Sequence, residues 1–204
     1  MSWYEVYLKD IEKKGTLENY VDDKIKNKKV LINLIKKYNK NNKLIESGSG
    51  TGVLSTYMAS LGYDVTGIDI DKDILKLSKK IAKNYNSKNK PNFQIKSIFE
   101  LDYKKNNFDV SFSNGVLEHF TNEQIIDTLK RQMKMAKIVI FGIPTKYFNQ
   151  EEAMYGDERY MSYKFWRSLI NDAGGMILEE KSMHYMNKRK RLLNFKKYFR
   201  PYPY

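Results

Sequence analysis

The chain has 204 residues, of which 41% are hydrophobic and 14% aromatic, and it carries a formal net charge of +13. This length and composition suit one folded domain with a substantial core, and they exclude a largely disordered chain. No apolar run approaches the roughly 20 residues that a membrane span needs, and the first residues lack the apolar core of a signal peptide, so we expect a cytoplasmic protein.

Two further features of the composition limit the chemistry. Cysteine is absent, which excludes disulfides, thiolate metal sites and cysteine nucleophiles, and we predict no metal site. Every acidic residue lies at or before Glu180, so residues 181–204 carry eight positive charges and no negative one. The positive charge is therefore concentrated in a C-terminal tail, while the rest of the chain is only weakly basic.

A helical pattern comes first along the chain. From Thr16 to Tyr38, apolar residues recur at helical spacing, and the asparagine-rich stretch 39–42 breaks the pattern. We therefore expect residues 1–42 to form an N-terminal helical cap and residues 43–204 to form the main domain. Within the main domain, a basic tail begins at about residue 187.

From residue 44 onward, strand-like and helical patterns alternate. Five apolar runs are typical of strands: residues 44–45, 65–70, 93–95, 108–112 and 138–143. The helical pattern after Thr121 begins with a capping box. The pattern after Ser162 places four residues on one buried face: Phe165, Trp166, Leu169 and Ala173. This alternation predicts a doubly wound α/β sheet with parallel strands and right-handed crossovers.

Three glycines, Gly48, Gly50 and Gly52, occupy alternate positions between the first strand and the following helix. Glycine permits positive φ and a close approach to the backbone, and the helix that follows offers unpaired amides to a negative group. The second strand ends at Asp69, where a carboxylate is placed to accept both hydroxyls of a ribose. The dinucleotide pattern fails at Val53, and no lysine of a triphosphate-binding loop follows the glycines.

The glycine loop and several later motifs together resemble one enzyme family. Residues 46–52, acid-x-Gly-x-Gly-x-Gly, resemble motif I of the class I S-adenosylmethionine-dependent methyltransferases. Residues 108–120, FDVSFSNGVLEHF, look like the fourth-strand motif of the small-molecule branch, and Ile143-Pro144 and residues 156–160 also fit that branch. The resemblance covers roughly residues 44–175. It implies a mostly parallel, seven-stranded Rossmann-like sheet with an N-terminal helical lid, with S-adenosylmethionine as cofactor and S-adenosylhomocysteine as product.

The resemblance also implies which residues hold the cofactor. They are Glu46, Ser47, Gly48, Gly50, Gly52, Asp69, Ile70, Ser97, Ile98 and Asn114. One position departs from the family, because members often carry an acid after strand three to contact the adenine amine, and this chain has Ser97 there. Ile98 still provides a backbone amide and an apolar wall for the adenine.

Methyl transfer is a displacement at a carbon that a sulfonium already activates. The protein mainly aligns the acceptor, which contributes ~7–11 kcal/mol. A base is needed only when the acceptor must lose a proton, and His119, just past strand four, is the candidate base. The alternative for His119 is a structural role beside Glu118. Glu158 and Arg159 either contact a polar substrate or form a surface ion pair.

Aromatic residues are candidates for the acceptor side of the site. In this family a lid usually comes from the N-terminal segment, whose aromatic residues either close over the sulfonium or pack in the core. These residues are Trp3, Tyr4, Tyr7 and Tyr20. A second group, after strand five, would line the acceptor pocket: Tyr147, Phe148, Met154 and Tyr155. The aromatic and methionine side chains of this second group predict an apolar or aromatic small-molecule acceptor.

The basic tail leaves other functions open. Residues 188–191 and 196–200 would hold phosphates in an RNA ribose or guanine methyltransferase, or contact an anionic membrane. The tail can instead supply the seventh strand over residues 191–199, with His184 in a structural role before it. A further alternative is a non-catalytic accessory protein that binds the cofactor. We favour the small-molecule methyltransferase, because the glycine loop and Asp69 are intact and the motif of base-amine methyltransferases is absent after strand four.

Overall fold

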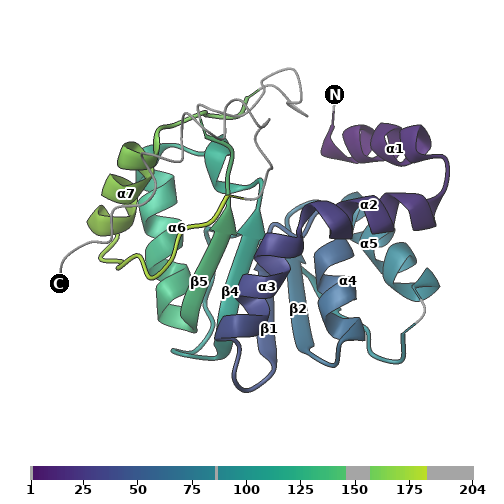
Figure 1. Cartoon of the computed structure of the whole chain (residues 1–204), viewed down its shortest axis with the longest axis horizontal. Helices are drawn as coiled ribbons and strands as arrows, with labels where there is room; N and C mark the ends of the chain where they lie inside the picture. Colours follow the sequence, from purple (N-terminus) through teal and green to yellow (C-terminus); the bar gives the residue numbers. More distant parts are fainter. Residues whose placement is uncertain (1, 86, 146–156, 183–204) are drawn as a thin grey trace.

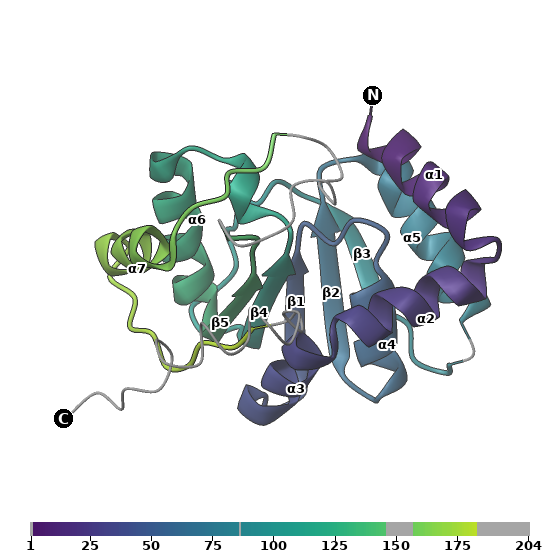
Figure 2. The same cartoon turned by 45° about the horizontal axis from the view of Figure 1, so that its top comes forward.

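A computed structural model describes residues 2–85, 87–145 and 157–182 of the protein. Its centre is a sheet of five parallel strands in the order β3-β2-β1-β4-β5 (Figures 1 and 2). The strands are β1 Lys43–Ser47, β2 Asp64–Asp69, β3 Asn92–Ile95, β4 Phe108–Asn114 and β5 Ala136–Gly142. The strand order reverses between β1 and β4, and in such sheets ligands bind in the crevice outside the carboxyl ends of the strands at this point.

Helices cover both faces of the sheet (Figures 1 and 2). They are α1 Trp3–Lys14, α2 Leu17–Asn27, α3 Lys29–Tyr38, α4 Val53–Ser60, α5 Lys72–Asn84, α6 Asn122–Met135 and α7 Tyr163–Asp172, with a short 3-10 turn, η1, at Leu117–His119. One core joins α3 and α4 to one face of β1 and β4, through Ile35, Met58 and Phe112. On the other side, α6 and α7 share a separate core around Leu129 and Trp166.

The predicted doubly wound, parallel sheet is confirmed for the described residues, and the predicted seven strands are not. The described part of the chain contains five strands, and residues 176–182, after α7, form none. The predicted seventh strand, residues 191–199, lies outside the described residues, as do His184 and the basic tail. In the same part of the chain, no helix has the length and apolarity to cross a membrane.

Local signals set most helix ends correctly. The predicted capping box opens α6, since Thr121 Oγ1 accepts a hydrogen bond from Gln124 N and the Gln124 side chain accepts one from Thr121 N. The helical pattern from Thr16 to Tyr38 is confirmed, and it forms two helices because the backbone breaks at Lys28. The prediction that Phe165 is buried is wrong: its side chain is 38% exposed, because α7 packs through Trp166 and Leu169.

A buried carboxylate ties together the amino ends of the central strands. Asp109, 3% exposed, accepts hydrogen bonds from the Asn41 amide at 2.6 Å, the Lys43 amide at 3.3 Å and the Lys137 ammonium at 2.8 Å. Burial alone would raise the pKa of Asp109, but these donors outweigh it and lower the pKa below its usual value. Asp109 therefore stabilises the folded protein as an ionised group.

Asp109→Ala is expected to lower the free energy of unfolding at pH 7 by about 2 kcal/mol, because three donors lose their buried, charged acceptor. Asp102→Ala is the control: Asp102 is exposed and pairs with Lys96, so we expect a change below about 0.5 kcal/mol. Since the folded-state pKa of Asp109 is lowered, its contribution is complete above its unfolded pKa of about 4 and is lost as the pH falls. Urea unfolding at pH 7 and pH 3 measures both effects. If Asp109→Ala and the wild-type protein are equally stable at pH 7, Asp109 does not stabilise the fold as described.

Candidate active site

The chain leaves β1 through the glycine loop, residues 48–52, at the carboxyl edge of the sheet. The loop is held to the end of β2 by two hydrogen bonds, from Ser49 N to Ile68 O and from Gly50 N to Asp69 Oδ2, both 2.8 Å long. Gly48, Gly50 and Gly52 all adopt the left-handed conformation, with φ between 52° and 68°. Glycine is the residue that adopts this conformation without strain, so the loop requires it.

Packing adds a second reason for these glycines. A Cβ on Gly52 would lie 2.4 Å from the Phe93 ring, and one on Gly48 would lie 2.7 Å from the Val116 side chain. A Cβ on Gly50 would lie 2.6 Å from the hydroxyl of Tyr7, which belongs to α1. The sequence pattern predicted a close approach of a ligand, and the structure shows close approach of the protein's own side chains from α1, β3 and the segment after β4.

Asp69, the predicted ribose ligand, ends β2 beside the glycine loop. Its carboxylate accepts hydrogen bonds from Gly50 N at 2.8 Å and Asp71 N at 3.1 Å. Burial outweighs these bonds and raises the pKa of Asp69 above its usual value. A carboxylate offers about four lone-pair positions, so Asp69 retains capacity for two further hydroxyl donors while it shapes the loop.

Four buried polar atoms at this edge of the sheet accept or donate no hydrogen bond within the described residues. They are Ser47 Oγ at the end of β1, Ser49 Oγ in the glycine loop, Asn114 Oδ1 at the end of β4, and Glu118 Oε2 in η1. Buried polar groups in folded proteins nearly always have a partner. Their concentration at the point where strand order reverses fits a polar ligand in the crevice. Sequence reasoning predicted Ser47 and Asn114 here and missed Ser49 and Glu118.

Two buried carboxylates have pKa values near neutrality. Glu46, at the end of β1, is 5% exposed, and its Oε2 accepts hydrogen bonds from the amide and the hydroxyl of Ser55. Glu118 is 2% exposed. Burial raises the pKa of each to about 7. Glu46 was predicted from the motif, whereas nothing local marked Glu118 as buried.

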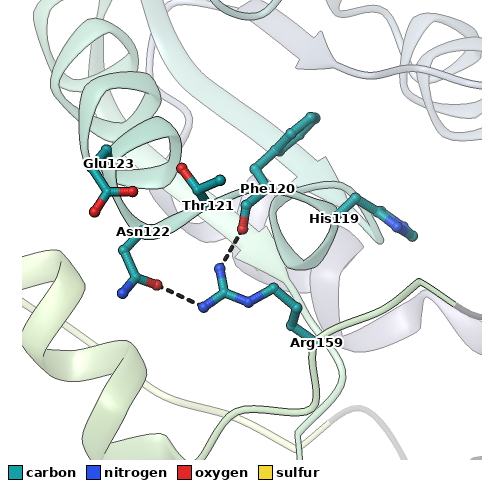
Figure 3. Close-up of a pocket in the computed structure, with 6 residues that line it drawn as sticks. All are labelled: His119, Phe120, Thr121, Asn122, Glu123 and Arg159. Carbon is teal, nitrogen blue, oxygen red and sulfur yellow. Dashed lines mark hydrogen bonds between the residues drawn. The ribbon is translucent and has the colours of Figure 1, made fainter.

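His119 lies just beyond, on the surface of a shallow cavity of about 390 Å³ (Figure 3). Its Nδ1 is 2.6 Å from Asp157 Oδ1, and the Trp3 ring meets the imidazole edge-on at a centroid distance of 5.4 Å. An imidazole whose Nδ1 hydrogen is held by a carboxylate presents Nε2 as a proton acceptor. Helix α1 therefore contacts both parts of the site: Tyr7 lies against the glycine loop, and Trp3 lies against His119.

Arg159 lines the same cavity, and its guanidinium donates to the Phe120 carbonyl and, at 2.7 Å, to Asn122 Oδ1 (Figure 3). The Arg159 amide also donates to the Glu118 carbonyl at 3.0 Å. Arg159 thus fastens the segment 157–161 to the start of α6, next to His119. Glu158, the other predicted substrate contact, lies beside it in the same segment and is partly buried.

The remaining predicted residues fall into three groups. Tyr20 is fully buried, with its hydroxyl 3.2 Å from Thr51 Oγ1, which favours core packing beneath the glycine loop over a lid role. Ile70 is 73% exposed beside Asp69, whereas Ile98 is buried and follows Ser97 after β3. The predicted acceptor pocket, Tyr147, Phe148, Met154 and Tyr155, lies outside the described residues.

Comparisons with known proteins identify methyltransferases as similar to this chain. Residues 38–196 match a family model described as a methyltransferase domain. No curated protein sequence matches the chain. Magnesium protoporphyrin IX methyltransferase from Synechocystis PCC 6803, solved with bound S-adenosylmethionine (SAM), is similar in structure, with a TM-score of 0.62, 18% identity, and coverage of 82% of this chain and 77% of that one. A SAM-dependent methyltransferase from Methanosarcina mazei has a TM-score of 0.58 and 16% identity, and the match covers 69% of this chain and 82% of that one.

Proposed function

Because the chain belongs to the methyltransferase domain family, we propose that it transfers a methyl group from SAM to a small-molecule acceptor. The observation that carries this proposal is the set of buried polar atoms without partners, Ser47, Ser49, Asn114 and Glu118, gathered beside Asp69 at the reversal of strand order. The similar structure from Synechocystis is solved with SAM and acts on magnesium protoporphyrin IX, which is a small molecule.

The residues fit the parts of this cofactor. Asp69 would accept the ribose hydroxyls, Ile70 and Ile98 would flank the adenine, and Ser97 would leave the adenine amine without a carboxylate. Asn114 and Ser47, at the ends of adjacent strands β4 and β1, would meet the methionine end. The cofactor supplies the activated methyl group, and the protein aligns the acceptor with it.

His119 is the residue that would take the proton of a hydroxyl or amine acceptor. Asp157 holds Nδ1 and leaves Nε2 to accept the proton, while the Trp3 ring restricts the imidazole to one orientation. Trp3 and Tyr7, one turn apart on α1, would form an aromatic cover between the glycine loop and His119. An aromatic cover of this kind suits a flat, apolar acceptor.

Calorimetric titration with S-adenosylhomocysteine tests the cofactor assignment. We expect the wild-type protein to bind it with a dissociation constant of roughly 1–100 μM, the lower part of the range common for enzyme ligands. ATP serves as the control, because it shares the adenosine but carries a triphosphate that the glycine loop has no lysine to neutralise. A folded protein that does not bind S-adenosylhomocysteine, or that binds ATP more tightly, contradicts the proposal.

A further inference from the structure

Helix α5 presents a row of lysines to solvent. Its sequence, KDILKLSKKIAKN, holds five lysines, all of them exposed: Lys72, Lys76, Lys79, Lys80 and Lys83. Spacings of four, three and four residues place Lys72, Lys76, Lys79 and Lys83 in one line along the helix, with Lys80 beside it. The line is about 16 Å long, because an α-helix rises about 1.5 Å per residue. These five residues form the lysine stripe of α5.

The charge of the lysine stripe is mostly uncompensated. The one acid within α5, Asp73, pairs with Lys76 at 2.8 Å, and among the described residues the other four lysines form no ion pair. Helix α6, of similar length, differs: its exposed face mixes Glu123 and Asp127 with lysines. A lysine-rich composition alone does not explain a face of single sign, and such a face attracts a polyanion.

A cleft of about 380 Å³ between α1 and α5 adjoins the lysine stripe (Figures 1 and 2). It is lined by Tyr4 and Leu8 from α1 and by Asp73, Lys76, Leu77 and Lys80 from α5. Tyr4 and Leu8 are one helical turn apart, so they lie on the same side of α1. The cleft thus combines apolar side chains with two lysines of the stripe, and it fits a ligand with an apolar chain and an anionic head.

Two observations favour a lipid surface over a nucleic acid as the polyanion. The stripe contains lysine and no arginine, whose planar fork is the group best suited to bidentate recognition of phosphate. Clusters of lysine on a helix bind anionic lipid headgroups as simple point charges. The second observation is the cleft, because the aliphatic side chains of Leu8 and Leu77 match a lipid chain, whereas a nucleic-acid backbone would leave them in water.

We propose that the lysine stripe and the cleft between α1 and α5 bind the surface of an anionic phospholipid bilayer. The lysines contact the headgroup phosphates, and Tyr4 and Leu8 contact the apolar region beneath them. Helix α5 begins just after Asp69, with Asp71 as its N-cap, so this contact holds the carboxyl edge of the sheet next to the bilayer. An apolar acceptor dissolved in the bilayer would then lie close to the candidate active site.

Co-sedimentation of the full chain with vesicles tests the stripe. We expect binding to phosphatidylcholine vesicles that contain about 30% phosphatidylglycerol, and binding at least about tenfold weaker to phosphatidylcholine alone. Raising the salt from about 0.1 M to about 1 M should abolish most of the binding, because the Debye length falls from about 10 Å to about 3 Å. The triple variant Lys72→Gln, Lys79→Gln, Lys83→Gln should bind the anionic vesicles about 100-fold more weakly, since each lysine near such a surface contributes about fivefold.

A matched triple variant removes the same charge elsewhere: Lys36→Gln on α3 with Lys130→Gln and Lys134→Gln on α6, all at exposed positions. It should bind nearly as the wild type does, because α3 and α6 pack on β5 and α5 packs on β3, at the other end of the sheet. Urea unfolding checks that both triple variants are folded.

Three results would overturn the inference: no binding of the wild type to anionic vesicles, equal losses in the two triple variants, or tighter binding of an RNA than of vesicles at equal phosphate concentration. The cofactor takes no part in this assay, so any of these results leaves the proposed function standing.

A single substitution tests the cleft. Leu8→Gln is expected to weaken binding to anionic vesicles by about fivefold, because Leu8 is already half-buried and only part of its side chain is left to enter the apolar region. Leu61→Gln is the control, since Leu61 is a 43% exposed leucine at the end of α4, away from the cleft. If Leu8→Gln and Leu61→Gln bind equally, the cleft does not take part in lipid binding.

Discussion

Asp69→Ala is expected to weaken S-adenosylhomocysteine binding by about 100-fold or more, because each of two ribose hydroxyls loses a hydrogen bond to a charged acceptor worth about 1.5–3 kcal/mol. The substitution also removes the acceptor for the Gly50 amide, 2.8 Å away, and so loosens the glycine loop. Calorimetric titration of the variant under the conditions used for the wild type measures the effect.

Two further variants separate the contributions of Asp69. Asp69→Asn keeps the size of the side chain and an acceptor oxygen for Gly50 N, but it removes the charge, so its loss of affinity should lie between those of the wild type and Asp69→Ala. Asp64→Ala, at the exposed other end of β2, should bind as the wild type does. If Asp69→Ala remains folded and keeps wild-type affinity, Asp69 is not the ribose ligand.

Gly52→Ala is expected to lower the free energy of unfolding by about 3 kcal/mol or more. The backbone at Gly52 has φ +67°, and a Cβ there would lie 2.4 Å from the Phe93 ring and 3.0 Å from Ser78 Cβ. The left-handed conformation costs about 1–2 kcal/mol for an L side chain, and overpacking a tight core adds about 1–3 kcal/mol. Urea unfolding of the purified variant measures the sum.

Gly62→Ala isolates the conformational part of this effect. Gly62 also has a positive φ, +96°, but a Cβ there would meet nothing within 4 Å, so only the strain of about 1–2 kcal/mol remains. Phe93→Leu, combined with Gly52→Ala, should recover part of the loss by relieving the contact with the ring. Equal losses at Gly52 and Gly62 would show that packing against Phe93 is not what requires the glycine.

Most elements of this fold could be predicted from local sequence. The five strands come from apolar runs, and the start of α6 comes from the reciprocal bonds of Thr121 and Gln124, three residues apart. A capping box of the same kind, Ser2 with Glu5, opens α1 and was a signal for a helix that the apolar pattern did not mark. These features depend on neighbours within one or two turns, so sequence reasoning reaches them.

Some outcomes of local patterns depend on distant partners. The apolar spacing from Thr16 to Tyr38 is continuous, yet the chain breaks at Lys28, where α2 turns to pack on α4 and α3 turns to pack on β4 and β5. Tyr20 has the aromatic character of a lid residue, but it is enclosed with Val21, Val53 and Ile81. Packing between elements decided both.

The sequence by itself determined the parallel α/β alternation, the glycine loop and the acid at the end of β2, because each rests on residue types at short, regular spacing. Only the tertiary structure decided which distant groups meet at that edge. His119 meets Asp157 and Trp3, which lie 38 and 116 residues away from it in the sequence. Such meetings depend on how strands order in the sheet and how α1 and α3 fold back over it, and residue spacing along the chain carries no measure of either.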